Sequence, residues 1–337
     1  MRKEIRLLAA AGTLLALTAA GPAAVAARDE PLAPRVVTTF PGGYVYGSFA
    51  ESLAVGPQGE MYATVTIWTD REWNVGQVWR IEPDGRMRQL GADLQVGILT
   101  GLALDRDGSL FVGLVTFDIA GVRSGVLRFD TTGTATRAVT LPAGTFPNGL
   151  ALDDGHLYVS DSFNGAVWRA ERGVVGNQRL THPWLRDATL SVASADGWEG
   201  VNGIAFWGTT LYAVNADTGC VVKVPLSRNG RPGDPSVAGG DPALVGADGI
   251  AFDAQGSLWI AVNHGDLPVG GALARMDASG SVRVMASDPG WLDYPSQPAF
   301  DTRTGHLTSL YILNGSLNTG NPNLIALRVG VAGQPLP

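Results

Sequence analysis

One short sequence phrase recurs six times along this chain, at intervals of 46 to 54 residues. Each copy has an oxygen-bearing residue, three mostly small or apolar residues, an alternating strand pattern and a turn that contains glycine. The copies are ESLAV, TGLAL, NGLAL, NGIAF, DGIAF and SQPAF, which begin at residues 51, 100, 148, 202, 248 and 296. A repeat of about 40–50 residues that contains several short strands is typical of a β-propeller.

Each repeat predicts four antiparallel strands. The first strand begins at the oxygen-bearing residue, and a glycine turn leads to a second, apolar strand such as LFVGL at 110–114. A third strand and a weaker fourth follow, for example VLRFDT at 126–131 and AVTLP at 138–142. We therefore predict an all-β fold, a six-bladed β-propeller with four antiparallel strands per blade. The strand at 36–40 is expected to close the ring as the outer strand of the last blade, because closure removes an exposed sheet edge.

The N-terminus has the pattern of a secretory signal peptide over residues 1–27. Three basic residues within 2–6 precede an apolar stretch at 7–20, and small residues suited to cleavage follow. The apolar stretch is too short for a comfortable membrane span; an uncleaved anchor is the alternative. We therefore expect an exported protein, secreted or periplasmic, with one propeller domain over residues 28–337 and no membrane contact after cleavage.

The charge pattern and the motifs that the sequence lacks exclude several functions. The net charge is −7 and basic residues do not cluster, which disfavours nucleic acid and anionic membranes as partners. The single cysteine cannot form an internal disulfide. No G-x-S-x-G elbow, phosphate-binding loop or dinucleotide motif occurs, which weakens the case for a serine esterase or a nucleotide-binding enzyme. We expect a monomer that acts on a small-molecule substrate.

Equivalent positions of six blades form a ring around the channel, and here all six carry oxygen. The ring residues are Glu51, Thr100, Asn148, Asn202, Asp248 and Ser296. Carboxylate and amide oxygens are ligands that Ca²⁺ accepts, whereas Mg²⁺ requires a stricter octahedron and zinc favours cysteine and histidine. The ring therefore predicts a calcium cofactor, with Glu51, Asn148, Asn202 and Asp248 as its ligands. The alternative is that these Asn-Gly and Asp-Gly pairs only mark tight turns that open strands.

At these residues the chain resembles the SMP-30/gluconolactonase/luciferin-regenerating enzyme family and, more distantly, diisopropylfluorophosphatase and the paraoxonases. The resemblance covers most of residues 44–329. It rests on FAESLAV, FPNGLALDDGHLYVSDS, VNGIAF and ADGIAFDAQGSLWIA, which begin at residues 49, 146, 201 and 247. It implies a calcium ion in the channel, held at the same four ring positions, and hydrolysis of lactones, other esters or phosphotriesters.

The chain also departs from its relatives. Glu-Ser-Leu stands at 51–53 where the family usually has Glu-Gly-Pro, and Gly249 stands where the paraoxonases have asparagine. The paired histidines of the paraoxonases are not matched, which puts any mechanism based on a histidine dyad in doubt.

We expect Asp248 to act as general base or nucleophile and Glu51 to act as a metal ligand, although the two roles are exchangeable. Thr100 and Ser296 are expected to orient substrate or water. Loops that follow the second strands lie on the same face as the ring, and side chains on them are candidates for substrate contact or for simple packing. These candidates are Trp68, Phe117 and His264.

The function predicted from the sequence is calcium-dependent hydrolysis of a lactone or related ester by an exported enzyme. Two alternatives remain open. One is a propeller that binds a ligand without catalysis, and the other is a lyase or condensing enzyme on the same scaffold.

Overall fold

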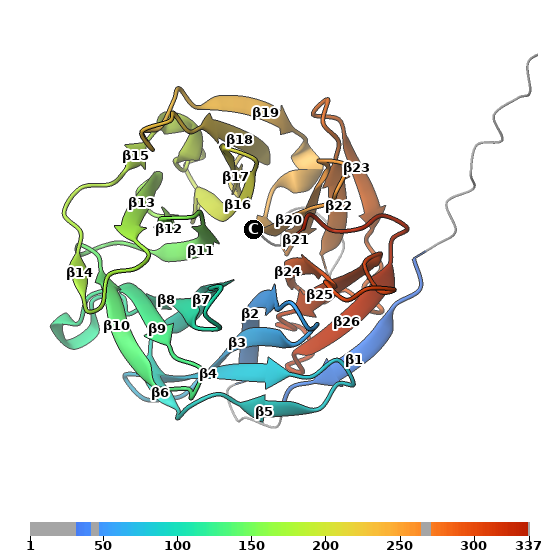
Figure 1. The fold of residues 1–337 in the computed structure, drawn as a ribbon, viewed down its shortest axis with the longest axis horizontal. Helices are drawn as coiled ribbons and strands as arrows, with labels where there is room; N and C mark the ends of the chain where they lie inside the picture. The colour runs from blue at the N-terminus through green and yellow to red at the C-terminus, as the bar shows by residue number, and fades with distance from the viewer. Residues whose placement is uncertain (1–31, 42–46, 264–270, 336–337) are drawn as a thin grey trace, which may run out of the picture. The chain divides into compact units, whose positions relative to one another are not determined.

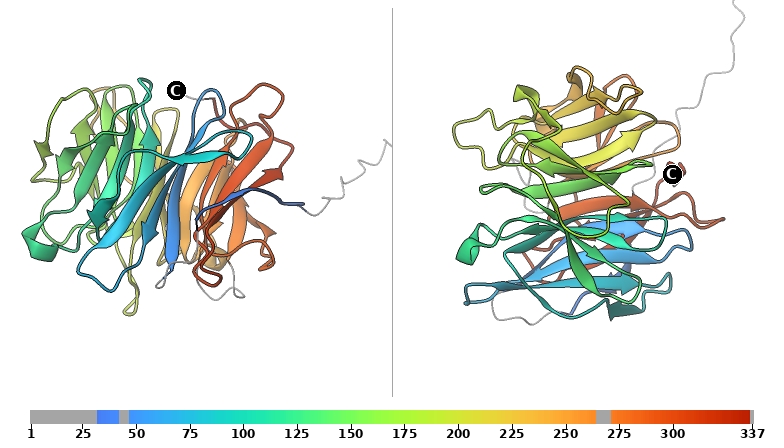
Figure 2. Two further views of the ribbon diagram at one scale, coloured as in Figure 1. Left: turned by 90° about the horizontal axis from the view of Figure 1, so that it is seen from below. Right: turned by 60° about the vertical axis from the view of Figure 1, so that its left-hand side comes forward.

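The computed structural model describes residues 32–41, 47–263 and 271–335. The signal peptide predicted at 1–27 lies outside the described residues. Over the described part, six sheets are arranged around one axis (Figure 1). Figure 2 shows the sheets from the side, with their strands running between the two faces of the ring.

The blades are numbered here in chain order, and their strands are given from the axis outward. Blade 1 contains β2 (Ser48–Val55), β3 (Met61–Ile67), β4 (Asn74–Ile81), β5 (Met87–Gln89) and β6 (Leu94–Val96), the last two both pairing with β4. Blade 2 contains β7 (Ile98–Leu104), β8 (Leu110–Val115), β9 (Gly125–Phe129), β10 (Ala135–Thr140) and β14 (Gln178–Arg179). Blade 3 contains β11 (Pro147–Leu152), β12 (His156–Asp161), β13 (Ala166–Glu171) and β15 (Leu185–Arg186).

The remaining blades complete the ring. Blade 4 contains β16 (Val201–Trp207), β17 (Thr210–Asn215), β18 (Cys220–Pro225) and β19 (Ser236–Gly240). Blade 5 contains β20 (Ala247–Phe252), β21 (Leu258–Val262), β22 (Ala272–Met276) and β23 (Val282–Ala286). Blade 6 contains β24 (Pro295–Phe300), β25 (Ser309–Asn314), β26 (Asn323–Arg328) and β1 (Arg35–Thr39).

Helix is nearly absent from the described residues. It is confined there to three single 3₁₀ turns, η1 (Ile119–Gly121), η2 (Ala188–Leu190) and η3 (Pro242–Leu244). None of the helices in this part of the chain has the length and apolar character needed to cross a membrane.

The six-bladed all-β prediction is confirmed, including the closure of the ring. The N-terminal strand β1 pairs antiparallel with β26, so the two ends of the described chain share blade 6. One pairing differs from the expected antiparallel pattern. Strand β14 lies between β13 and β15 of blade 3 in sequence, yet it pairs parallel with β10 on the outer edge of blade 2. This crossing covers an edge that blade 2 would otherwise expose.

Apolar side chains fill the spaces between blades. The buried apolar residues form six clusters, and each cluster joins two neighbouring blades. Strands near the axis are therefore covered on both faces, as in β8, which is buried at every position. Double coverage explains why the second strand of each repeat is a continuous apolar run instead of an alternating one.

Each of the six inner strands has a β-bulge at its ring residue. In blade 3, for example, Pro147 lies opposite Asp161 and Leu150 opposite Val159, so one extra residue is inserted at Asn148–Gly149. The other five inner strands show the same register shift at their ring residues. A bulge bends the strand and redirects a side chain. The alternative that these dipeptides are tight turns is wrong, because they lie inside strands.

The glycine after the ring residue allows neighbouring inner strands to approach closely. A Cβ added to Gly149 would lie 2.6 Å from the carbonyl oxygen of Asn202. A Cβ added to Gly203 would lie 2.3 Å from the carbonyl oxygen of Asp248. Real Cβ atoms do not approach backbone so closely, so these positions require glycine for space.

We predict that Gly203→Ala destabilises the protein by about 1–3 kcal/mol, because the added methyl forces the two inner strands apart. Chemical denaturation measures the effect. Gly173→Ala is the matched control, since nothing lies within 4 Å of a Cβ at that exposed position. Equal stability of the two variants would contradict the close-approach explanation.

Candidate functional site

The ring residues lie where the six inner strands begin, at one mouth of the channel. Five of the six are buried, and only Glu51 is partly exposed. Hydroxyl groups opposite two of the bulges hold the ring backbone. Thr64 Oγ1 donates to the carbonyl of Thr100 at 3.1 Å, and Ser160 Oγ donates to the carbonyl of Asn202 at 2.7 Å. Each bond runs from one blade to the next, so the ring positions are fixed between blades.

Three carboxylates act on one another at this mouth. Burial, together with the negative charge of Glu199, raises the pKa of Glu51 to about 8. Burial raises the pKa of Asp248 well above its usual range, and the charges of Glu51 and Glu199 add to the effect. A hydrogen bond from Asn263 Nδ2 to Asp248 Oδ2, 2.6 Å long, opposes the shift. The mouth is therefore a centre of crowded negative charge.

Glu199 is a member of this centre that the repeat pattern did not reveal. Asn148 Nδ2 donates to Glu199 Oε2 at 3.3 Å, and Asn202 Nδ2 donates to Glu199 Oε1 at 3.4 Å. One carboxylate thus bridges the ring residues of blades 3 and 4. Glu199 precedes Asn202 by three residues, in a loop that does not repeat, so comparing equivalent positions misses it. The only sequence signal that pointed to Glu199 was its position just before the repeat motif NGIAF.

The two ring asparagines are oriented by these contacts. Asn148 Nδ2 also donates to Ser162 Oγ at 3.1 Å, and Ser162 Oγ donates onward to the carbonyl of Val201 at 2.7 Å. An amide group whose nitrogen is engaged has its oxygen available as an acceptor. Both asparagines can therefore offer Oδ1 to a ligand in the channel.

Thr100 and Ser296 use their hydroxyls between blades. Thr100 Oγ1 donates to the carbonyl of Pro147 at 2.7 Å, and Ser296 Oγ donates to the carbonyl of Ala50 at 3.0 Å. Both residues are almost fully buried. Through these hydrogen bonds Thr100 and Ser296 connect the inner strands of neighbouring blades. Their expected contact with substrate stays a prediction.

The loops around the mouth carry aromatic side chains. Phe117 is 45% exposed and has a left-handed backbone, with φ of 52°. Trp68 directly follows β3 and is partly exposed, and its backbone N–H donates to the carbonyl of Gly47 at 3.1 Å. The predicted contact residue His264 lies outside the described residues. Asp161, also on this face, is buried and accepts hydrogen bonds from its own blade and loop, including one from Trp168 Nε1 at 3.0 Å.

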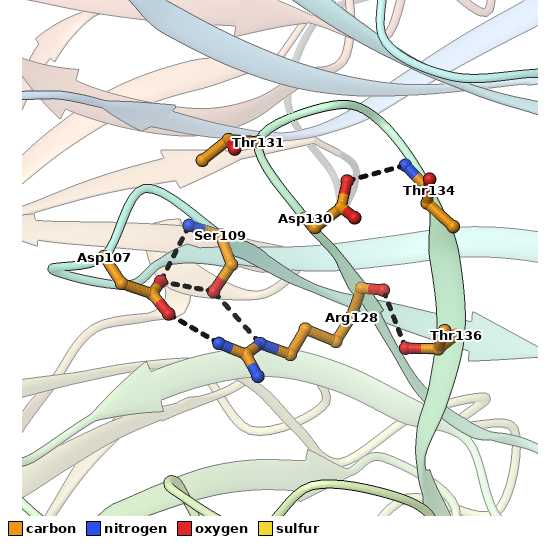
Figure 3. Close-up of a pocket in the computed structure, with 7 residues that line it drawn as sticks. All are labelled: Asp107, Ser109, Arg128, Asp130, Thr131, Thr134 and Thr136. Carbon is orange, nitrogen blue, oxygen red and sulfur yellow. Dashed lines mark hydrogen bonds and ion pairs between the residues drawn. The ribbon is translucent and has the colours of Figure 1, made fainter.

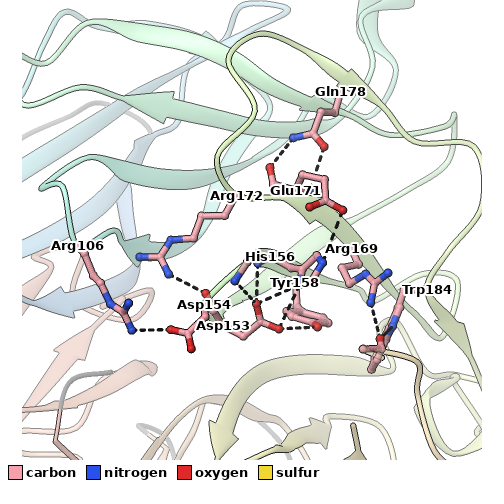
Figure 4. Close-up of polar contacts among 12 residues, drawn as sticks. Arg106, Asp153, Asp154, His156, Tyr158, Arg169, Glu171, Arg172, Gln178 and Trp184 are labelled. Carbon is pink, nitrogen blue, oxygen red and sulfur yellow. Dashed lines mark hydrogen bonds and ion pairs between the residues drawn. The ribbon is translucent and has the colours of Figure 1, made fainter. Parts of the chain in front are cut away.

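Polar clusters also occur at the opposite face, in the turns between first and second strands. In the pocket of Figure 3, the Arg128 guanidinium forms an ion pair with Asp107 and donates a hydrogen bond to Ser109 Oγ. In Figure 4, Asp153 accepts hydrogen bonds from Tyr158 and from the backbone of His156. These side chains bind one another and their own turns, which indicates a structural role.

The donor set at the mouth fits calcium better than zinc. Across the described ranges, no three acidic, histidine or cysteine side chains converge closely enough to hold a metal ion by themselves. A cation would therefore need the amide oxygens as well, which Ca²⁺ accepts readily. Asn263 Oδ1 is buried and has no hydrogen-bond partner within the described part of the chain. Such an oxygen beside Asp248, with the crowded carboxylates, suits a divalent cation or its bound water.

In chelator-treated protein, Glu51→Gln should raise the free energy of unfolding at pH 8 and above, by up to roughly 4 kcal/mol, and leave it unchanged near pH 4.5. The pKa of Glu51 is raised to about 8 in the folded state. Between about pH 4.5 and pH 8 the folded native protein therefore retains a proton that the unfolded chain has lost. The free energy of unfolding of the native protein falls as the pH rises through this range. Denaturation curves at several pH values measure the difference.

The control for this experiment is Glu72→Gln, which neutralises an exposed glutamate in a loop. We expect no comparable pH-dependent gain from it. A Glu51→Gln variant that matches native stability at every pH would show that the carboxylates are not crowded.

Residues 185–315 match the sequence profile of the SMP-30/Gluconolactonase/LRE-like region. Solved structures also resemble the propeller. A gluconolactonase of Xanthomonas campestris has a TM-score of 0.55 at 20% identity, and the alignment covers 88% of this chain and 89% of that one. A luciferin-regenerating enzyme has a TM-score of 0.53 at 13% identity, covering 87% and 95%. An auxiliary nutrient binding protein of Bacteroides ovatus has a TM-score of 0.58 at 11% identity, covering 88% and 77%.

These comparisons confirm the family resemblance found in the sequence. No curated relative matches the chain. At such identities the structural likeness shows the fold alone, so the resemblance to the family rests on the profile match over residues 185–315. It supports a lactonase-like hydrolase at the level of the family.

Proposed function

We propose that this propeller, which carries an SMP-30/Gluconolactonase/LRE-like region, is an exported calcium-dependent hydrolase of a lactone or related ester. One observation carries the proposal. Two ring carboxylates and two ring amides meet at one mouth of the channel, and burial, together with the charge of neighbouring carboxylates, raises the pKa values of both ring carboxylates. Buried like charges are costly unless a cation or a proton compensates them.

The residues that would hold calcium are Glu51, Asn148, Asn202 and Asp248. Four protein oxygens leave two or more of the positions that calcium usually fills open to water and substrate. When bound, the ion would polarise the substrate carbonyl and stabilise negative charge on its oxygen. Glu199 would hold the two asparagines in place, because its carboxylate accepts a hydrogen bond from Nδ2 of each.

Asp248 is the residue to which we assign proton acceptance from water. Its carboxylate is buried, and Asn263 holds one of its oxygens, so its orientation is fixed. Glu51 is the more exposed of the two ring carboxylates and is assigned to ligation; exchange of these roles is the alternative. A water placed between Asp248 and a bound carbonyl would attack as its proton moves to the carboxylate.

The charge of the mouth also bears on the substrate. Three carboxylates in one partly buried region repel anions. A neutral lactone or ester is therefore favoured over a carboxylate or phosphate monoester. Export is included in the proposal because of the sequence pattern at residues 1–27.

We predict that protein expressed with its native N-terminus and recovered from periplasm or medium hydrolyses at least one compound in a lactone and aryl-ester panel with calcium present. A chelator should abolish turnover. Asp248→Asn should lower kcat by about 100-fold or more, because the proton acceptor is lost. Asp234→Asn neutralises an exposed aspartate outside the mouth and should change kcat less than about twofold. The mass of the recovered protein reports whether the signal peptide was removed.

Each other outcome of the panel has a definite meaning. Activity that survives both chelator and Asp248→Asn would refute the mechanism. Calcium binding without turnover would support a non-catalytic binding propeller. A product formed without oxygen from isotopically labelled water would indicate a lyase or condensing enzyme.

A further inference from the structure

Four aromatic side chains form a continuous row along the rim of the mouth, here called the aromatic arc. Phe117 contacts Phe146 with ring centroids 6.0 Å apart, Phe146 contacts Phe163 at 4.8 Å, and Phe163 contacts Trp198 at 5.2 Å. Phe146 is the one buried member of the arc. Phe117, Phe163 and Trp198 are 45%, 37% and 66% exposed. Three exposed apolar rings, of which Phe117 joins the other two through the buried Phe146, are unusual on a soluble protein surface and mark a binding surface.

The first ring of the arc is held outward by a well-bonded loop. Phe117 and Asp118 both have left-handed backbones, with φ of 52° and 56°. This conformation is uncommon for a residue with a bulky side chain. Thr116 Oγ1 donates to the carbonyl of Val122 at 2.7 Å, and Gly144 N donates to Asp118 Oδ2 at 2.8 Å. The loop therefore maintains an exposed aromatic ring at a conformational cost, which is expected of a functional position.

The aromatic arc is continuous with the polar centre. Trp198 is adjacent in sequence to Glu199, whose carboxylate accepts hydrogen bonds from both ring asparagines. Phe146 directly precedes β11, in which Asn148 is the second residue. The arc thus runs over blades 2 to 4 and ends beside the ring residues. A molecule whose reactive group lies at the centre would lay an extended substituent along these rings.

Polar side chains next to the arc are already engaged with the protein. Asp118 pairs with Arg123 at 3.0 Å. Asn164 Nδ2 donates to the carbonyl of Gly144 at 2.9 Å and to the carboxylate of Asp161. A polyhydroxylated ligand would have to displace these bonds, whereas an apolar substituent would only exchange water for aromatic surface. The carboxylates at the centre disfavour an anionic ligand.

We propose that the aromatic arc binds the apolar part of the substrate, so that the substrate class is neutral lactones or esters with an alkyl chain or aryl group, not sugar lactones. The inference rests on the proposed function for the reactive end of the molecule. Binding of the apolar part itself is independent of turnover and is tested separately.

The binding test uses N-phenyl-1-naphthylamine, a neutral aryl fluorophore that brightens in apolar sites, titrated into the full protein with calcium. Trp198→Ala removes the most exposed ring. Phe117→Asn removes another and places asparagine where a left-handed backbone is required, which asparagine tolerates. Leu307→Ala is the control, because Leu307 is 42% exposed in a turn at the opposite face. We expect saturable binding, weakened about fivefold or more by either arc variant and unchanged by the control.

The kinetic test compares δ-undecalactone with D-glucono-δ-lactone, which share a lactone ring but carry an alkyl chain or hydroxyl groups. We expect the native enzyme to prefer δ-undecalactone by about tenfold or more in kcat/KM. Both arc variants should lower kcat/KM for δ-undecalactone, mainly through KM, and leave that for D-glucono-δ-lactone within about twofold.

The outcomes separate the two proposals. Arc-dependent probe binding without turnover of either lactone, or of any compound in the lactone and aryl-ester panel, supports the arc and refutes the hydrolase. Turnover that is equal in native protein and arc variants, or probe binding that the variants do not weaken, overturns the arc. Sedimentation at low and high protein concentration adds a last check, since arc-dependent dimerisation would mean that a second copy of the chain covers these rings.

Discussion

A one-residue bulge in each inner strand is the feature on which the rest of this molecule depends. It turns the ring side chain away from the regular strand alternation and, in the middle blades, is followed by a glycine that lies against the ring carbonyl of the next blade. Glycine at these places is required for space. The same device therefore packs the blades together and brings oxygen donors from different sheets to one mouth of the channel.

The donors are held there against an electrostatic cost. Burial raises the pKa values of Glu51 and Asp248, and the negative charge of Glu199 adds to both shifts, so the folded protein at neutral pH carries strain that the unfolded chain does not. The six apolar clusters between blades and the pairing of β1 with β26 supply stability elsewhere. Concentrating strain at one mouth of a well-packed scaffold is characteristic of a functional site.

The sequence predicted the repeating parts of the structure and missed the parts that do not repeat. Strand order, blade number and ring closure followed from the period of the repeat and from its register, because several residues in each blade carry the same pattern. The bulges were hidden because Asn-Gly and Asp-Gly are also turn signals. The parallel strand β14 and Glu199 belong to variable segments between β13 and β16, where no second copy exists for comparison. The hydrogen bonds that the hydroxyls of Thr100 and Ser296 donate to neighbouring blades depend on how the blades pack, which local sequence does not encode.

The central claim is that a divalent cation binds among Glu51, Asn148, Asn202 and Asp248, and a crystal structure grown with calcium tests it most directly. The account predicts one strong anomalous peak at the mouth of the channel, about 2.3–2.6 Å from a side-chain oxygen of each of these residues. A channel mouth without such a peak at saturating calcium, or side chains at these positions turned away from the axis, would contradict it.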